Sequence, residues 1–211
     1  MFRTFALVVV LLFTVAMIGC SDKQAQKVDA KVSAEPLSAP SMELDGKPVS
    51  LGGITFTPPS EWSDFGPSGM RKADYAYGPV GDDVDSATLS VYYFGPESGG
   101  SIEDNIKRWI GQMTMSDGSN AADKAERKTY QVVGMNAHMV KLAGIYNAGG
   151  MMMGGAATPK EGYLMEGIVL EAPGGNVFFK LTGPEASAQA MSSGFMAMMS
   201  QVKVDAPATA H

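Results

Sequence analysis

The sequence has little of the chemistry on which many enzymes and metal proteins depend. Among its 211 residues there are one cysteine, two histidines and two tryptophans. A single cysteine excludes an internal disulfide, and two histidines leave little material for a zinc site built on histidine. Positive charge is also scarce, with 16 Lys and Arg against 22 Asp and Glu. The net charge of −6 argues against nucleic-acid binding, which needs clustered basic residues.

The composition is otherwise that of a folded protein. Hydrophobic residues make up 45% of the chain and charged residues 18%. These proportions are typical of a globular protein and not of a disordered one. The length fits one domain with extensions, because domains usually contain about 100–200 residues.

A hydrophobic run stands at the N-terminus. It extends from Phe5 to Ile18 behind the positive charge of Arg3. This length is typical of a signal peptide and short of the roughly 20 residues that a membrane-spanning helix needs. The run ends in Gly19 and Cys20, and this ending resembles the lipobox of bacterial lipoproteins, in which a small residue precedes the lipidated cysteine. Met17 departs from the leucine that is usual in the motif.

The lipobox resemblance implies a location as well as a modification. Residues 1–19 would be a signal peptide, and Cys20 would become the acylated N-terminus. Two or more acyl chains, palmitate among them, anchor a protein stably to a membrane. The protein would then belong to the cell envelope, and Ser21 after the cysteine resembles outer-membrane sorting if the organism is Gram-negative. The alternative is an uncleaved anchor helix with an incidental cysteine.

The rest of the chain divides into a tether, a domain and a tail. Residues 20–48 contain no aromatic side chain and are rich in Ala, Ser, Lys, Asp and Pro, which predicts a flexible tether. Residues 49–204 carry the apolar periodicity of a single folded domain. Residues 205–211 are expected to be a loose tail.

Within the domain, the pattern of apolar residues is mostly that of strands. Alternation predicts strands at 54–57, 70–77 and 87–94, and hairpins at 128–146 and 163–182. Two helices interrupt this pattern. Ser101 is the expected N-cap of the first helix, and Pro184 the expected first residue of the last one.

This order of elements predicts an α+β fold. Strands joined by short turns are antiparallel, and amphipathic helices need a sheet face to cover. We therefore expect an antiparallel sheet of about six or seven strands, flanked by two main helices.

Several segments add a family resemblance. Trp62 in its PPSEW context, YFGPESGGS at 93–101, RWIGQ at 108–112 and FFKLTGPE at 178–185 resemble a group of uncharacterised bacterial lipoproteins. The order of elements is also similar to that of the PsbP/Mog-type αβα sandwich. The resemblance covers roughly residues 50–204. It implies a non-catalytic module that docks on a larger protein, and it assigns no functional residue.

A search for catalytic and cofactor motifs finds none. The chain has no G-x-S-x-G nucleophile motif and no Gly-Lys-Ser/Thr phosphate loop. His138 lies inside a predicted strand. Asp82, Asp83 and Asp85 lack the spacing of a calcium-binding loop, so a solvated acidic turn is the simpler interpretation. The sequence therefore predicts neither an enzyme nor a cofactor.

Methionine is the unusual residue, with 16 in the chain. Met151, Met152 and Met153 stand between two pairs of glycines. Thioethers are soft ligands that select Cu(I), but three consecutive residues point in different directions. A hydrophobic loop that contacts a partner, or one that is only mobile or packed, explains the same run.

Two functional hypotheses follow from these features. The first is a membrane-anchored envelope lipoprotein that acts as a non-catalytic binding or assembly module, with an envelope protein as its partner and Met151–Met153 as candidate contact. The alternative is a periplasmic or cell-surface binder of a small ligand or a soft metal such as Cu(I). An enzyme would instead need carboxylates such as Asp83, Asp85 or Glu166 to converge in a cleft.

Overall fold

The computed structural model describes residues 34–147 and 158–206. All of them belong to one compact unit, Val32–His211. Cys20 and the Met151–Met153 run lie outside the described residues, so their predicted roles stay predictions.

A nine-stranded sheet forms the centre of the unit, in the order β1-β8-β9-β10-β11-β6-β5-β4, with β7 paired to β9. The β1–β8 pair is parallel and the others are antiparallel. The strands of this sheet are β1 (Glu35–Pro36), β4 (Ser63–Asp64), β5 (Arg71–Tyr77), β6 (Ala87–Tyr93), β7 (Met113–Thr114), β8 (Glu126–Val132), β9 (Met135–Tyr146), β10 (Lys160–Ala172) and β11 (Gly175–Pro184).

The two predicted hairpins are confirmed. The β8–β9 turn consists of Val133 and Gly134, which both have positive φ angles of 49° and 80°. Two such residues match the right-handed twist of the strands that they join. The β10–β11 turn consists of Pro173 and Gly174, between the paired residues Ala172 and Gly175.

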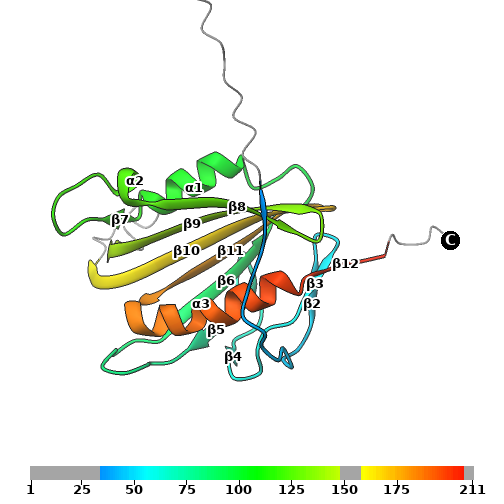
Figure 1. The fold of residues 1–211 in the computed structure, drawn as a ribbon, viewed down its shortest axis with the longest axis horizontal. Helices are drawn as coiled ribbons and strands as arrows, with labels where there is room; N and C mark the ends of the chain where they lie inside the picture. The colour runs from blue at the N-terminus through cyan, green and yellow to red at the C-terminus, as the bar shows by residue number, and fades with distance from the viewer. Residues whose placement is uncertain (1–33, 148–157, 207–211) are drawn as a thin grey trace, which may run out of the picture. The chain divides into compact units, whose positions relative to one another are not determined.

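The three helices are α1 (Ile102–Ile110), α2 (Ala121–Lys124) and α3 (Glu185–Ser200). The Ser101 hydroxyl caps α1 by accepting a hydrogen bond of 3.0 Å from the Asp104 N–H, as the sequence predicts. Helix α3 begins one residue later than expected, and Pro184 is its N-cap. The sheet lies between α1 and α3, which cover opposite faces (Figure 1).

Each face of the sheet therefore has its own hydrophobic core. The core under α3 is the larger one, and Met191, Phe195 and Met198 of the predicted helix stripe are fully buried in it. The core under α1 contains Ile106 and Trp109 together with apolar residues of β9, β10 and β11. Trp62 belongs to the α3 core, so the two tryptophans lie on opposite sides of the sheet.

The sheet is larger than the six or seven strands that the sequence predicts, and it is mixed. The additional strands β1, β4 and β7 contain two residues each. Two residues are too few to show an alternating pattern, because such strands are defined by their partners. A separate three-stranded sheet adds β2 (Val49–Leu51), β3 (Ile54–Phe56) and β12 (Lys203–Val204).

Part of the segment expected to be tether lies against the domain. Strand β1 pairs with Tyr130 and Gln131 of β8, and Leu37 and Leu44 pack on the α3 core. No helix within the described ranges, 34–147 and 158–206, is long and apolar enough to cross a membrane.

Candidate functional site

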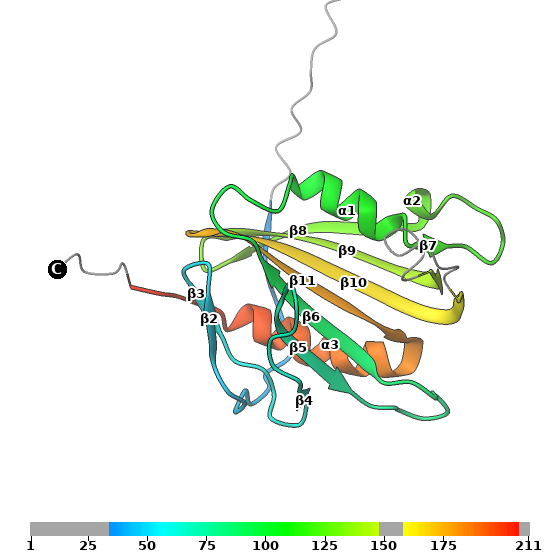
Figure 2. The ribbon, with the colours of Figure 1, turned by 180° about the vertical axis from the view of Figure 1, so that it is seen from behind.

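A pocket of about 410 Å³ lies beside α1, where that helix leaves part of its sheet face open. Helix α1 packs over β9 and β10, whereas none of the described helices covers β5 and β6 on that side (Figure 2). Side chains of β6, β11 and α1 form the pocket, together with Met70 before β5. Its lining residues are Met70, Tyr92, Phe94, Gly99, Asn105, Arg108, Trp109, Gln112, Phe178 and Lys180.

Aromatic rings form the wall of this pocket. Tyr92 and Phe94 stack with centroids 6.4 Å apart and an angle of 15° between their planes. The ring centroids of Phe94 and Phe178 are 5.8 Å apart, with the two rings tilted against each other. The Trp109 ring lies directly over Gly167 of β10, where an added Cβ would come within 2.4 Å of it. The absence of a side chain at Gly167 therefore lets α1 approach the sheet and complete the wall.

Two cations face the same pocket. The Lys180 Nζ donates hydrogen bonds to the Gln112 side chain and, at 3.1 Å, to the Tyr146 hydroxyl. Burial, together with the positive charge of Arg108, lowers the pKa of Lys180 to about 8. In the described part of the chain, neither Lys180 nor Arg108 forms an ion pair with a carboxylate.

Asn105 holds Arg108 in position. The Asn105 amide donates to the carbonyl oxygens of Gly99 and Ser101, at 2.8 Å in each case, and its oxygen accepts from the Arg108 guanidinium. The side chain is almost fully buried. The loop before α1 and the arginine on α1 are thus fixed to each other by one amide.

The open face around the pocket carries exposed apolar side chains. Met70 and Phe94 at the pocket are 64% and 42% exposed, and Phe65 after β4 is 66% exposed. A nearby carboxylate, Asp74 of β5, is already engaged by Arg71 at 2.6 Å and by Ser90 at 2.7 Å. The face therefore combines apolar surface with a positive centre.

A second cluster lies on the other side of Tyr146. Asp85 accepts hydrogen bonds of 2.7 Å from both Lys160 and Tyr163. These bonds lower the pKa of Asp85 and raise that of Lys160 to about 12. Tyr146 stacks on Tyr163 at 5.9 Å. In contrast to Lys180, this lysine is paired, so the cluster offers no free charge.

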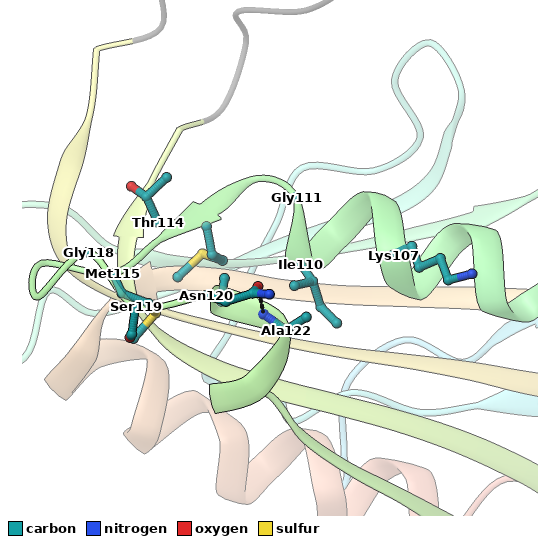
Figure 3. A pocket seen from close by; sticks show the side chains of 11 residues that line it. Lys107, Ile110, Gly111, Thr114, Met115, Gly118, Ser119, Asn120 and Ala122 are labelled. Atoms are coloured by element: carbon teal, nitrogen blue, oxygen red, sulfur yellow. Dashed lines mark hydrogen bonds between the residues drawn. The ribbon is translucent and has the colours of Figure 1, made fainter.

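A larger pocket, of about 500 Å³, lies between the end of α1, β7 and α2 (Figure 3). Most of its polar groups take part in local structure, although the Ser119 hydroxyl is buried without a hydrogen-bond partner among the described residues. The Asn120 side chain accepts a hydrogen bond of 2.9 Å from the Ala122 N–H and so caps α2. Lys107 extends along α1 away from the other lining residues, 3.9 Å from Glu103. With no converging polar groups, this pocket is a weaker candidate.

The carboxylates of the acidic turn at residues 82–85 are directed to different partners. Asp83 accepts hydrogen bonds from the backbone N–H and the hydroxyl of Ser187, whereas Asp85 binds Lys160. Among the residues that the structure describes, no three His, Cys, Asp or Glu side chains converge. Glu166 is buried under α3, where it is bound to Ser192 and Lys141 and to neither aspartate.

His138 is part of a ladder of polar side chains across strands. Its Nδ1 lies 3.3 Å from the Thr129 Oγ1, and its Nε2 lies 2.8 Å from a Glu171 carboxylate oxygen. The order hydroxyl, imidazole, carboxylate is that of a catalytic triad. However, in a triad the hydroxyl bonds Nε2 and the carboxylate bonds Nδ1, which is the reverse of the arrangement here. Thr129 and His138 are paired opposite each other in the β8–β9 ladder.

The sequence did not single out Lys180 or Arg108. Both lie in segments that carry the family resemblance, RWIGQ and FFKLTGPE, which appeared purely structural. The local signal was a lysine between the buried residues Phe179 and Leu181 of an otherwise apolar strand. The part that Lys180 plays in the pocket depends on Arg108 and Gln112, which lie about 70 residues away in the chain.

No known protein family and no curated protein matches the sequence. Among solved structures, LpqN, described as involved in cell envelope biogenesis of Mycobacterium tuberculosis, is similar with a TM-score of 0.45 and 11% identity, over 77% of this chain and 86% of that chain. CyanoP, the PsbP protein of the cyanobacterium Synechocystis, gives 0.44 and 15%, over 78% of this chain and 98% of that one.

A protein of unknown function from Pseudomonas aeruginosa, PA94, gives a TM-score of 0.43 and 13% identity, over 76% of this chain and 97% of that one.

Proposed function

We propose that this protein is a lipid-anchored, non-catalytic binding module of the cell envelope, and that the pocket beside α1 is its binding site. The anchor part rests on the lipobox resemblance at Cys20. The binding part rests on one observation, the pocket in which Arg108 and Lys180 face an aromatic wall on an uncovered sheet face.

The arrangement suits binding better than catalysis. Binding sites of this size usually combine an apolar lining with a few polar groups that fix orientation. The pocket has both, and its only titratable lining residues among those described are Lys180, Arg108 and Tyr92, with no carboxylate, thiol or imidazole beside them.

Photo-crosslinking in the cell's own envelope tests this proposal. The full-length protein would carry benzoylphenylalanine at position 94, where an exposed aromatic ring already lies at the pocket edge. The matched control carries it at Val133, which is also exposed but lies in the β8–β9 turn. Each variant is compared in a Cys20→Ser background.

We expect a discrete adduct on the peptide that contains position 94, absent at position 133 and lost or reduced with Cys20→Ser. Fractionation of the same cells should place the protein with Cys20 in the membrane and the Cys20→Ser protein outside it. Equal adduct patterns at both positions would contradict binding at the pocket. An unchanged membrane fraction without Cys20 would contradict the lipid anchor.

A further inference from the structure

The pocket beside α1 places two positive charges where no carboxylate of the described residues pairs with them. Transfer of a lysine ammonium out of water is unfavourable, and a second cation nearby adds to the cost. The lowered pKa of Lys180 reflects both effects. An anion in the pocket would remove the repulsion and replace part of the lost hydration.

The same cations have hydrogen-bond donors to spare. An ammonium has three N–H donors, and within the described residues Lys180 uses two of them, on Gln112 and Tyr146. A guanidinium has five N–H donors, and Arg108 donates from its Nη2 nitrogen to the Asn105 side-chain oxygen. Charge-assisted bonds from such donors are the strong ones, and a guanidinium binds carboxylate or phosphate with two of them at once.

The aromatic walls of the pocket indicate what kind of ligand body would carry the anionic group. Tyr92, Phe94 and Phe178 present ring faces and edges beside Trp109, and Met70 adds a flexible thioether. Stacked and edge-on rings favour a flat apolar body. A volume of about 410 Å³ accommodates such a body together with its head group.

The net charge of the whole chain also favours this pocket as the place where an anion binds. The net charge is −6, so an anionic ligand is repelled by most of the surface. A local pair of cations in a partly dry pocket is then the place where such a ligand is retained. Several exposed cations of the described residues are paired, as Lys160 is with Asp85 at 2.7 Å and Lys128 with Glu126 at 2.5 Å, and others stand on open surface without an aromatic wall.

We infer that the pocket between α1 and the β6–β11 face binds a small ligand with an anionic head group, a carboxylate or phosphate, on a flat aromatic or apolar body. Arg108 and Lys180 hold the head group, and the rings of Tyr92, Phe94 and Phe178 cover the body. This inference deepens the proposed function and rests on it.

Three probes share a naphthalene ring and differ in their head group: naphthoate, naphthyl phosphate and the uncharged naphthamide. Their affinities distinguish the contribution of the anionic head group from that of the hydrophobic ring. The full chain in lipid nanodiscs is titrated with each by calorimetry, with empty nanodiscs as the blank. The indole N–H signals of Trp109 and Trp62 in NMR spectra report where binding occurs, because only Trp109 lines the pocket.

We expect the anionic probes to bind at least about tenfold more tightly than naphthamide, because the donors are charged. Only the Trp109 signal should shift. Lys180→Gln and Arg108→Gln should each weaken anion binding by about tenfold or more. Lys107→Gln removes the same charge from an exposed position on the same helix and should change binding less than about twofold.

The outcomes separate the inference from the proposed function. Equal affinity for naphthamide and the two anions overturns the anionic head group but leaves a binding pocket. A shift of the Trp62 signal alone places binding elsewhere and overturns the assignment. If no probe binds at millimolar concentration, the ligand class is wrong, and the crosslinking result at position 94 still decides whether the pocket binds at all. Wild-type protein gives these answers even if a variant fails to fold.

Discussion

Lys180 is a cation held in surroundings that favour its neutral form. The groups around its Nζ are Arg108 on α1, Gln112 after α1, and Tyr146 on β9, with Tyr92 of β6 across the pocket. None of them is an acid at neutral pH. A side chain in this position lowers the stability of the folded protein, which points to a role in binding and not in folding.

Replacement of Lys180 should therefore stabilise the protein. Lys180→Met keeps the length of the side chain and removes the charge. At pH 7 we expect the free energy of unfolding to rise by roughly 1–3 kcal/mol. Lys107→Met, on the exposed side of α1, should leave it nearly unchanged. Chemical denaturation followed by circular dichroism measures both.

The pH dependence of this gain follows from the pKa of Lys180, about 8 in the folded protein against an ordinary value of 10.5. Below pH 8 both states carry the proton, and the folded state bears the full desolvation cost. Between pH 8 and 10.5 the unfolded state binds more protons, so the wild type becomes more stable as pH rises. The advantage of Lys180→Met should shrink over this range. An advantage that is constant with pH would contradict the assignment of the cost to charge.

At the scale of elements, α3 depends on a residue outside itself. Pro184 at its N-cap has no side-chain donor or acceptor for the first turn. Asp83, from the loop between β5 and β6, replaces it by accepting bonds of 2.7 and 2.6 Å from the N–H and hydroxyl of Ser187. The carboxylate also lies at the positive end of the helix dipole.

Asp83→Ala should accordingly destabilise the protein by about 1–2 kcal/mol, as loss of a helix cap usually does. Asp82→Ala, one residue earlier and exposed, should change stability by less than about 0.5 kcal/mol. Thermal unfolding of the two variants provides the comparison. Equal losses of stability in the two variants would mean that the negative charge of this turn, and not the helix cap, stabilises the protein.

Helix α1 depends on a residue of the sheet. Gly167 leaves the space in which the Trp109 ring lies, and an alanine Cβ would come within 2.4 Å of that ring. Gly167→Ala should cost about 1–3 kcal/mol and move α1 outward, because a close-packed core cannot absorb the methyl group.

Intrinsic fluorescence and denaturation measure the effect, with Gly111→Ala as control. Gly111 has an ordinary helical φ of −63°, and an added Cβ there lies 3.3 Å from its nearest neighbour. A Gly167→Ala protein with unchanged stability and an unchanged Trp109 spectrum would show that α1 is not seated as described.

The elements that the sequence predicted correctly are those with long local patterns. The hairpins β8–β9 and β10–β11, the capped helix α1 and the methionine-rich helix α3 were all visible in spacing and turn residues. The strands β1, β4 and β7 were not, because two residues carry no periodicity. The pocket was also missed, since it exists only where α1 meets β11, and chain spacing does not encode that meeting.

At the scale of the whole molecule, one sheet supports two cores on opposite faces. Strands β9, β10 and β11 contribute side chains to both, for example Ile168 to one and Val169 to the other. Loss of either core would uncover the strands that the other needs. We therefore expect the domain to unfold in a single cooperative transition.

The two tryptophans allow a direct check, because each core contains one. In a Trp62→Phe protein, fluorescence reports the α1 core, and in a Trp109→Phe protein it reports the α3 core. Within each variant the fluorescence and circular dichroism midpoints in guanidinium chloride should coincide. An earlier fluorescence transition in the Trp62→Phe protein would mean that α1 detaches before the sheet unfolds.

The short strands at the two ends of the large sheet affect how readily copies of the domain aggregate. An uncovered strand edge is a template on which another copy can polymerise. Here one edge ends in β1, which contains Pro36 and covers only Tyr130 and Gln131 of β8. The remaining edge of β8 begins with the charged run Glu126–Arg127–Lys128, and the other end of the sheet carries only the two residues of β4. Aggregation of the domain through its strand edges is therefore disfavoured at high local concentration.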